Sequence, residues 1–230
     1  MTADEWRTST RPGPMLDWLE ANHLAPPRKK RLFVFSACRL GWDDVRPEMR
    51  LLLEAAEDYV ETPTADDPLA SGKLHDALLS LCRVTLSSLE STMIHRISFA
   101  INSDAKAPAY LAEVNDLAEV APPPALAALM REQFGDPFRK VRWVSSRLRD
   151  KIDPRPADLL LVREWLTWER GIVLGLAQAI DEERAWERMP ILADALEDAG
   201  CDEPALLEHL RQAEGHARGC WAMDLLLGRE

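Results

Sequence analysis

The stretch from residue 189 to residue 201, Met-Pro-Ile-Leu-Ala-Asp-Ala-Leu-Glu-Asp-Ala-Gly-Cys, carries the clearest structural signal in the chain. Pro190 suits the first turn of a helix, because amide groups there have no partner within the helix and a proline has no amide hydrogen to lose. Gly200 stands where helices commonly end in a left-handed residue. The stretch predicts a helix that begins at Pro190 and stops at Gly200. The residues that follow it, up to the end of the sequence, predict two further short helices.

Apolar residues recur at helical spacing along most of the chain, which favours an all-α fold. The run Leu32-Phe33-Val34-Phe35 would also suit a buried strand, but its continuation to Leu40 keeps a helical stripe. The longest uninterrupted pattern covers 69–101 and predicts one long helix that includes Leu74 to Ile97. Shorter helices are expected at 14–25, 28–40, 47–60, 108–120, 125–134, 157–170 and 172–188.

Prolines mark the expected divisions of the chain. Pro122-Pro123-Pro124 predicts a stiff, extended linker, and 62–68 predicts an exposed loop. The sequence therefore predicts an irregular multi-helix bundle with one long central helix, arranged as an N-terminal region 1–120 and a C-terminal region 125–230. Both regions could also belong to a single domain.

Composition limits the classes of function. The chain has 230 residues and a formal net charge of −11, which argues against direct nucleic-acid binding because phosphate neutralisation needs a basic surface. The same charge suits binding to a basic partner protein. The four cysteines have no short-spaced pair and no secretory leader precedes them, so we expect reduced thiols in a cytoplasmic protein. No apolar run is long enough to predict a membrane span.

Familiar catalytic motifs do not occur. The sequence has no Gly-x-Ser-x-Gly elbow, no Gly-x-x-x-x-Gly-Lys phosphate loop, no Gly-x-Gly-x-x-Gly fingerprint and no Glu-x-x-His pair. The acidic groups at 181–183 and 194–198 are expected to be solvated faces. Cys38 follows a run of apolar residues and is expected to be a buried structural thiol, although the adjacent Arg39 could lower its pKa. Whether the protein is an enzyme stays open.

The C-terminal region gathers two of the five histidines and two of the four cysteines, which are potential metal ligands: Cys201, His209, His216 and Cys220. Zinc takes four such ligands, but this spacing is not a familiar zinc motif. If 202–211 is helical, Cys201 and His209 lie about 12 Å apart along the axis. His216 and Cys220 are four residues apart and would share one face of the last helix. Alternatively, the cysteines are small buried residues and the histidines are hydrogen-bonded or capping residues.

A basic stretch at 139–151 interrupts the acidic sequence. Its candidate partner-binding residues are Arg139, Arg142, Trp143, Arg147 and Arg149. Arg and Trp are enriched at binding hot spots, which favours a protein interface. The arginines could instead pair with the acidic helices of the same chain.

The C-terminal block resembles a family of uncharacterised proteins present in many paralogous copies in planctomycete bacteria. The resemblance rests on Phe134-Gly135-Asp136-Pro137-Phe138-Arg139, on Trp165-Leu166-Thr167-Trp168, on Leu176 to Ile180, on Pro190 to Cys201 and on His216-Ala217-Arg218-Gly219-Cys220-Trp221. An N-terminal echo covers 31–39, and the segment between Arg139 and Trp165 is longer than the pattern. The resemblance implies a shared fold and no activity.

Two functional hypotheses follow. The first is a non-enzymatic protein that binds another protein, as an accessory subunit of a larger assembly. The second is a zinc-binding or catalytic protein that uses the C-terminal Cys/His residues. In both, Trp221 and Leu225 are expected to dock the last helix on 172–199 as a structural lock.

Overall fold

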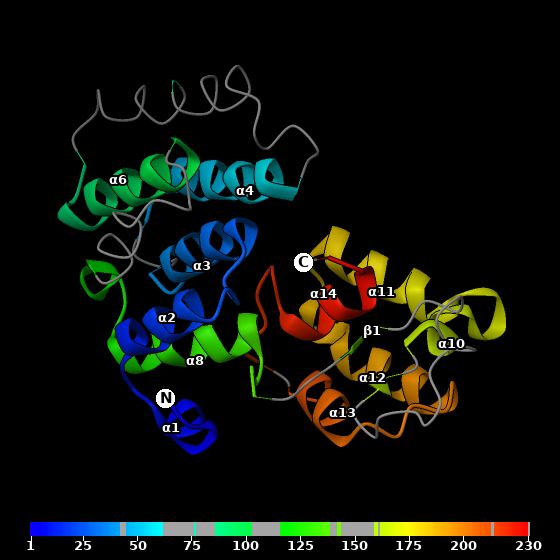
Figure 1. Ribbon diagram of the computed structural model, residues 1–230. Helices are drawn as coiled ribbons and strands as arrows, with labels where there is room; N and C mark the ends of the chain where they lie inside the picture. Colours follow the sequence, from blue (N-terminus) through cyan, green and yellow to red (C-terminus); the bar gives the residue numbers. More distant parts are fainter. Residues whose placement is uncertain are drawn as a thin grey trace. The chain divides into compact units, whose positions relative to one another are not determined.

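The computed structural model describes residues 1–41, 45–61, 76, 86–102, 116–138, 142–143, 159–160, 162–212 and 214–229. Helices dominate this part of the chain, which confirms the predicted all-α, multi-helix class (Figure 1). The one strand pairing within it is two residues long, with β1 (Arg142–Trp143) parallel to β2 (Leu159–Leu160). None of the helices in these residues is long and apolar enough to cross a membrane.

The chain divides into two compact units, Met1–Phe134 (unit 1) and Gly135–Glu230 (unit 2). The division differs from the boundary expected at 121–124, because the three prolines do not form an extended linker. Pro123 is the first residue of helix α8 (Pro123–Phe134), and the carbonyl of Pro122 accepts the amides of Ala125 and Leu126. A proline is well suited to the first turn of a helix, so this proline run starts an element of unit 1.

Unit 1 is built around helix α3 (Pro27–Arg39), which confirms the helical interpretation of its apolar run. Every residue from Leu32 to Cys38 is buried. Figure 1 shows α3 between two pairs of helices, which are α2 (Pro12–Ala21) with α8, and α4 (Pro47–Glu61) with α6 (Ser88–Asn102). Contacts from α4, α6 and α8 leave α3 little exposed surface. The remaining described elements of unit 1 are α1 (Ala3–Thr8) and the 3-10 helix η2 (Asp116–Glu119).

The basic residues that begin α3 each have a separate partner. Arg28 makes two hydrogen bonds to Glu61, of 2.6 and 3.2 Å. Buried Lys29 donates to the carbonyl of Gln133 at 2.6 Å, and Lys30 lies 2.7 Å from a carboxylate oxygen of Glu20. Cations near a helix N-terminus oppose the helix dipole. These contacts offset that repulsion and tie α3 to α2, α4 and α8.

The prediction of one uninterrupted helix over 69–101 is wrong, because Leu86 and Ser87 are not helical. Helix α6 begins at Ser88 because Ser87 and Glu90 form a reciprocal cap: the Glu90 amide donates to Ser87 Oγ at 3.2 Å, and the Ser87 amide donates to Glu90 Oε2 at 2.9 Å. Arg46 binds the same carboxylate with 2.7 and 3.0 Å hydrogen bonds and, as the largest cause, lowers the pKa of Glu90 to about 2. Apart from Asp76, residues 69–85 lie outside the described residues, as do the expected loop at 62–68 and most of the expected helix at 108–120.

Unit 2 consists of short helices around α11 (Ile172–Glu183). The other elements are α10 (Val162–Thr167), η3 (Trp168–Arg170), η4 (Trp186–Arg188), α12 (Met189–Asp198), α13 (Pro204–Leu210) and α14 (Trp221–Leu227). Helix α11 packs on α10, α12 and α14. It follows Gly171 as expected but ends at Glu183, because Arg184 is left-handed.

The sequence predicts that the last helix is packed and is not a free tail, and α14 is packed in this way. All five residues from Ala222 to Leu226 are buried, and Leu225 and Leu226 belong to the apolar core of unit 2. At about 1.5–3 kcal/mol for each large buried side chain, this helix contributes a sizeable part of the stability of the unit.

Helix α12 has the predicted start and stop. Pro190 lies in its first turn, and Gly200 follows its last turn with φ of +86°. The Cys201 amide donates to the carbonyl of Leu196, and the Gly200 amide donates to that of Glu197. These two bonds form a Schellman motif, which needs a left-handed residue at Gly200.

Gly200→Ala should lower the free energy of unfolding by about 1 kcal/mol, because a Cβ disfavours the left-handed backbone. The loss comes from conformation alone, since a Cβ at Gly200 would meet no atom within 4 Å. Gly175→Ala is the matched control: Gly175 lies inside α11 with the same open space, so this change should stabilise by about 0.5–1 kcal/mol. Urea denaturation measures both, and equal signs for the two variants would contradict the assignment.

Candidate metal centre

Three of the four predicted metal ligands converge in unit 2. His209 is the penultimate residue of α13, Cys220 directly precedes α14, and His216 lies in the segment that connects these helices. One ligand atom from each of the three lies within 4.8 Å of the other two. His209 Nε2 and Cys220 Sγ are 3.1 Å apart.

The structure corrects the expected placement of His216 and Cys220. They do not share a helix face, because α14 begins only at Trp221 and residues 214–220 have no regular helix. A fold of the connecting segment brings them together instead. The carbonyl of Cys220 accepts the Asp224 amide at 2.9 Å, and the Cys220 amide donates to the carbonyl of Ala217 at 3.0 Å. These bonds fix the backbone at the thiol.

His216 is held in a defined tautomer. Its Nε2 lies 3.0 Å from the carbonyl oxygen of Gln212, and a carbonyl only accepts hydrogen bonds, so Nε2 carries the hydrogen. In a neutral ring the lone pair is then on Nδ1. Histidines that bind metals are typically oriented in this way, with one ring nitrogen donating to a carbonyl and the other facing the metal.

Trp221 supports the other histidine. Its ring centroid lies 5.0 Å from that of His209, and the His209 ring lies 5.1 Å from the His216 ring in an edge-to-face arrangement. Trp221 also packs closely on Gly135, where an added Cβ would come within 3.0 Å of the indole. With φ of +67° as well, Gly135 is required on two counts for this packing.

The environment of Cys220 is apolar on one side and polar on the other. Cys220 itself is fully buried within the core that includes Leu206, Leu210 and Met223. His209 and His216 are partly buried. Apolar core residues therefore surround the Cys220 side chain, whereas the two imidazoles are more exposed than this thiol.

These distances suit a small ion after slight side-chain movement. Zinc binds imidazole nitrogen at about 2.0 Å and thiolate sulfur at about 2.3 Å, so neighbouring ligand atoms of a tetrahedral site lie roughly 3.5 Å apart. The 3.1 Å contact is slightly shorter than this edge, and the 4.8 Å limit is longer. Without a metal, the short contact is a hydrogen bond between imidazole and thiol.

Cys201, the fourth predicted ligand, does not belong to this group. It lies 5% exposed in a hollow of about 490 Å³ between α12 and α13. Burial raises the pKa of the Cys201 thiol to about 11, against a smaller lowering by a backbone hydrogen bond.

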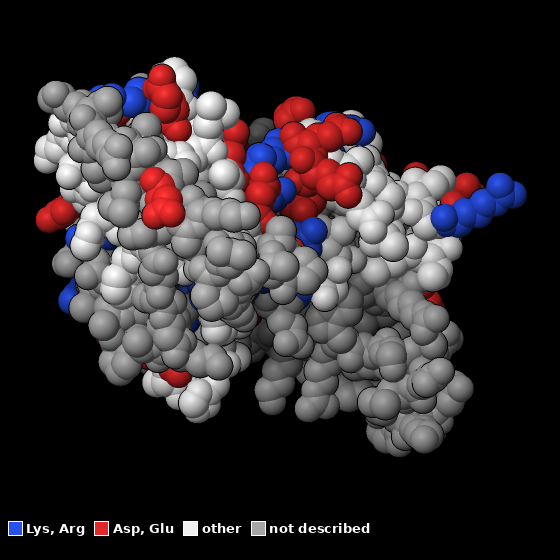
Figure 2. Space-filling view, turned by 90° about the horizontal axis from the view of Figure 1, so that it is seen from above, with Lys and Arg blue, Asp and Glu red and all other residues white. Residues whose placement is uncertain are grey.

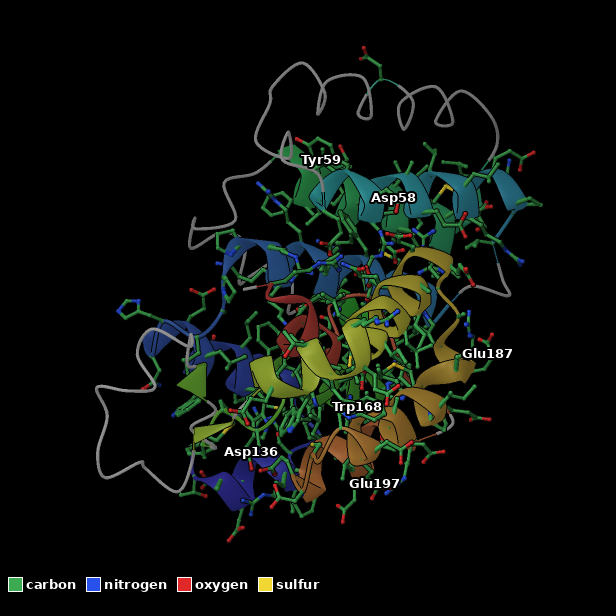
Figure 3. All side chains as sticks on the ribbon, turned by 90° about the vertical axis from the view of Figure 1, so that its right-hand side faces the viewer. Asp58, Tyr59, Asp136, Trp168, Glu187 and Glu197 are labelled. Atoms are coloured by element: carbon green, nitrogen blue, oxygen red, sulfur yellow. The ribbon has the colours of Figure 1, made fainter. Side chains whose placement is uncertain are left out.

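The charged residues that line the hollow beside Cys201 are mostly acidic. The lining residues of this hollow are Glu197, Cys201, Asp202, Pro204, Leu207, Glu208 and Arg211. Arg211, the one cation among them, pairs with Glu197 and with Asp194 at 3.4 Å, and the hydrogen bond to Glu197 is the main reason that its pKa is raised. Glu197, labelled in Figure 3, lies at the exposed side of α12.

The predicted acidic clusters are partly structural. Asp181 is buried, and its carboxylate accepts a 2.7 Å hydrogen bond from Arg229. Glu183 pairs with Arg188 at the surface. Figure 2 shows acidic side chains gathered on the face that it draws, with basic side chains among them. These contacts explain the carboxylates as ion-pair partners and solvated groups.

Arg39 does not lower the pKa of the adjacent Cys38 thiol. Burial raises the pKa of the Cys38 thiol to about 12, although Arg96 opposes this shift. Arg39 instead makes hydrogen bonds of 2.6 and 2.7 Å to Glu57. The thiol is a structural residue in the core of unit 1.

The predicted partner-binding stretch 139–151 lies outside the described residues except for the backbone of Arg142 and Trp143. Its candidate residues therefore stay a prediction. Conversely, sequence reasoning missed the contact of Gln212 with His216, and it predicted Trp221 as a docking residue of the last helix but not as a neighbour of His209. The glycines at 215 and 219 were a usable signal, because they make a continuous helix from His216 to Cys220 unfavourable.

No family model, curated protein or solved structure matches this chain. The resemblance of the C-terminal block to planctomycete paralogues stays a prediction, and function has to be argued from the geometry of unit 2.

The thiol of Cys201 should react slowly with iodoacetamide at pH 8, because only the thiolate is the nucleophile. With a pKa of about 11, its labelling rate should rise about tenfold for each pH unit up to that value. Peptide mapping by mass spectrometry follows Cys201 separately from the other thiols, and urea-unfolded protein gives the reference rate. Native labelling at pH 8 as fast as in urea would contradict the burial of this thiol.

Proposed function

We propose that this protein is a cytoplasmic zinc-binding protein whose metal is held in unit 2 by His209, His216 and Cys220. The observation that carries the proposal is the convergence of one ligand atom from each residue within 4.8 Å. Imidazole nitrogen and thiolate sulfur are the ligand types that zinc takes most often. Harder ions such as Mg²⁺ and Ca²⁺ prefer oxygen ligands and do not fit this set.

Two features of the surroundings support the proposal. The carbonyl of Gln212 fixes the His216 tautomer in the way that ligating histidines are held. The apolar core behind Cys220 excludes water from the thiolate side, which strengthens its electrostatic attraction to a cation. Zinc in this setting would be bound from two helix ends and the segment between them.

Metal analysis tests the proposal. Full-length protein is stripped with a chelator, reloaded with zinc and desalted, and its zinc content is measured by inductively coupled plasma mass spectrometry. We expect about one zinc per chain, because the three ligands form a single site. Cys220→Ser and His209→Gln should each lose most of the retained zinc.

Cys201→Ser is the matched control, because it changes a second buried cysteine of the same unit that is outside the group. It should retain zinc as the unaltered protein does. Cobalt loading adds a spectroscopic check, since the sulfur-to-cobalt charge-transfer band should be lost in Cys220→Ser and in His209→Gln but persist in Cys201→Ser. Failure of the unaltered protein to retain zinc would reject the proposal, and so would equal retention by all variants.

The second proposal is that the protein is an accessory subunit that binds a partner protein through a Lys- or Arg-rich segment. The net charge of −11 and the acidic hollow between α12 and α13 support it, because both suit a cationic partner. Exposed Asp202 and Glu208 line the hollow beside the Arg211 pairs.

Reversing two charges of the hollow, Asp202→Lys with Glu208→Lys, should abolish salt-sensitive binding of a partner isolated from the native host. Reversal of Glu182 and Glu187, exposed acidic residues away from the hollow, is the control and should weaken binding much less. Equal losses in both variants would show an effect of total charge, and no loss would reject the hollow as the binding site.

A further inference from the structure

The last helix of unit 2 is too short to be stable by itself. Helix α14 has seven residues, whereas isolated helices shorter than about 12–15 residues are marginal in water. Its position therefore depends on contacts with α11 and α13 and on what fastens its two ends. The five consecutive buried residues from Ala222 to Leu226 would be exposed if it separated.

The C-terminal end of α14 is fastened to α11 through Asp181. Arg229 follows the helix and donates to Asp181 Oδ2 at 2.7 Å, and its amide closes the helix on the carbonyl of Asp224 at 2.9 Å. Arg218, which precedes the helix, donates to the backbone carbonyl of Asp181 at 3.3 Å. One residue of α11 thus holds both flanks of α14.

The N-terminal end of α14 meets α13 at the candidate metal centre. Cys220 is the residue before the helix, and its sulfur faces His209 near the end of α13. Cys220 makes no side-chain capping bond to the first turn of α14. Trp221, the first residue of the helix, lies against the same histidine.

We propose that the metal clamps the start of α14 to the end of α13, so that loss of the metal releases the C-terminal helix. The inference rests on the proposed zinc site. His209 belongs to α13, Cys220 directly precedes α14, and His216 lies in the segment between them. The ion would therefore join the end of α13 to the start of α14 by closing the loop between them. An ion bound only by the docked arrangement stabilises that arrangement by mass action.

This clamp has a quantitative consequence. If α14 can leave only after the ion has dissociated, the population of the released helix falls by the factor 1 + [Zn]/Kd. Amide exchange of 222–227 should therefore slow by up to about 100-fold at free zinc of about 100 times Kd, in proportion to zinc concentration. A structural ion that does not control the helix would leave this exchange unchanged.

Hydrogen exchange of the full-length protein, read by mass spectrometry at buffered free zinc, tests the clamp. Peptides that cover 221–229 should show the concentration-dependent slowing, and peptides of α3 in unit 1 should not. Cys220→Ser should exchange at the metal-free rate at every zinc concentration. Cys201→Ser, the matched control, should keep the full zinc dependence.

Arg229→Gln provides a second variant that should fold and bind zinc. It removes the ion pair with Asp181 at the other end of the helix, so exchange should be faster at every zinc concentration while the zinc dependence persists. Equal exchange with and without zinc, in protein that demonstrably retains one zinc, would overturn the clamp and leave the zinc site intact. Absence of zinc retention would instead reject the proposed function.

Discussion

Burial of α14 in the core of unit 2 is the interaction on which the candidate site depends. A helix with polar residues on one face would lie on the surface and leave Cys220 free to point to water. Here Ala222 to Leu226 are all buried, so the backbone on both sides of the helix is drawn against α11 and α13. This places Cys220 beside His209 and forces the segment between them to fold back, which carries His216 into the same space.

The three cysteines that the structure describes differ in the groups that surround their thiols. Cys38 and Cys201 are buried without a nearby group that would stabilise a thiolate sufficiently, and burial raises their pKa values to about 12 and about 11. Cys220 is equally buried but has an imidazole nitrogen 3.1 Å from its sulfur. Burial alone makes a thiol inert, whereas burial beside two histidines brings one sulfur and two imidazoles together as candidate metal ligands.

Unit 1 is organised differently, because its central helix α3 is surrounded by other helices of the unit. The apolar run of α3 is buried on every side. The charged residues at its two ends therefore form ion pairs with neighbouring helices. Arg28, Lys30 and Arg39 each pair with a glutamate from a neighbouring helix. Such pairs contribute modestly to stability when partly exposed, but each one selects the neighbour against which α3 packs.

Much of the local structure follows from the sequence alone, since propensity and caps act within a few residues. The helical class, the Pro190 start, the left-handed Gly200 and the helix over the apolar run of α3 could all be predicted. The break before Ser88 was also encoded locally, as the Ser87 and Glu90 cap, but the apolar pattern across it concealed it. The site was predictable only as a set of residue types near the C-terminus. That His209, His216 and Cys220 meet while Cys201 does not was decided by tertiary packing, because it depends on where the buried face of α14 docks and how the non-helical connection returns. No spacing rule along the sequence contains that information.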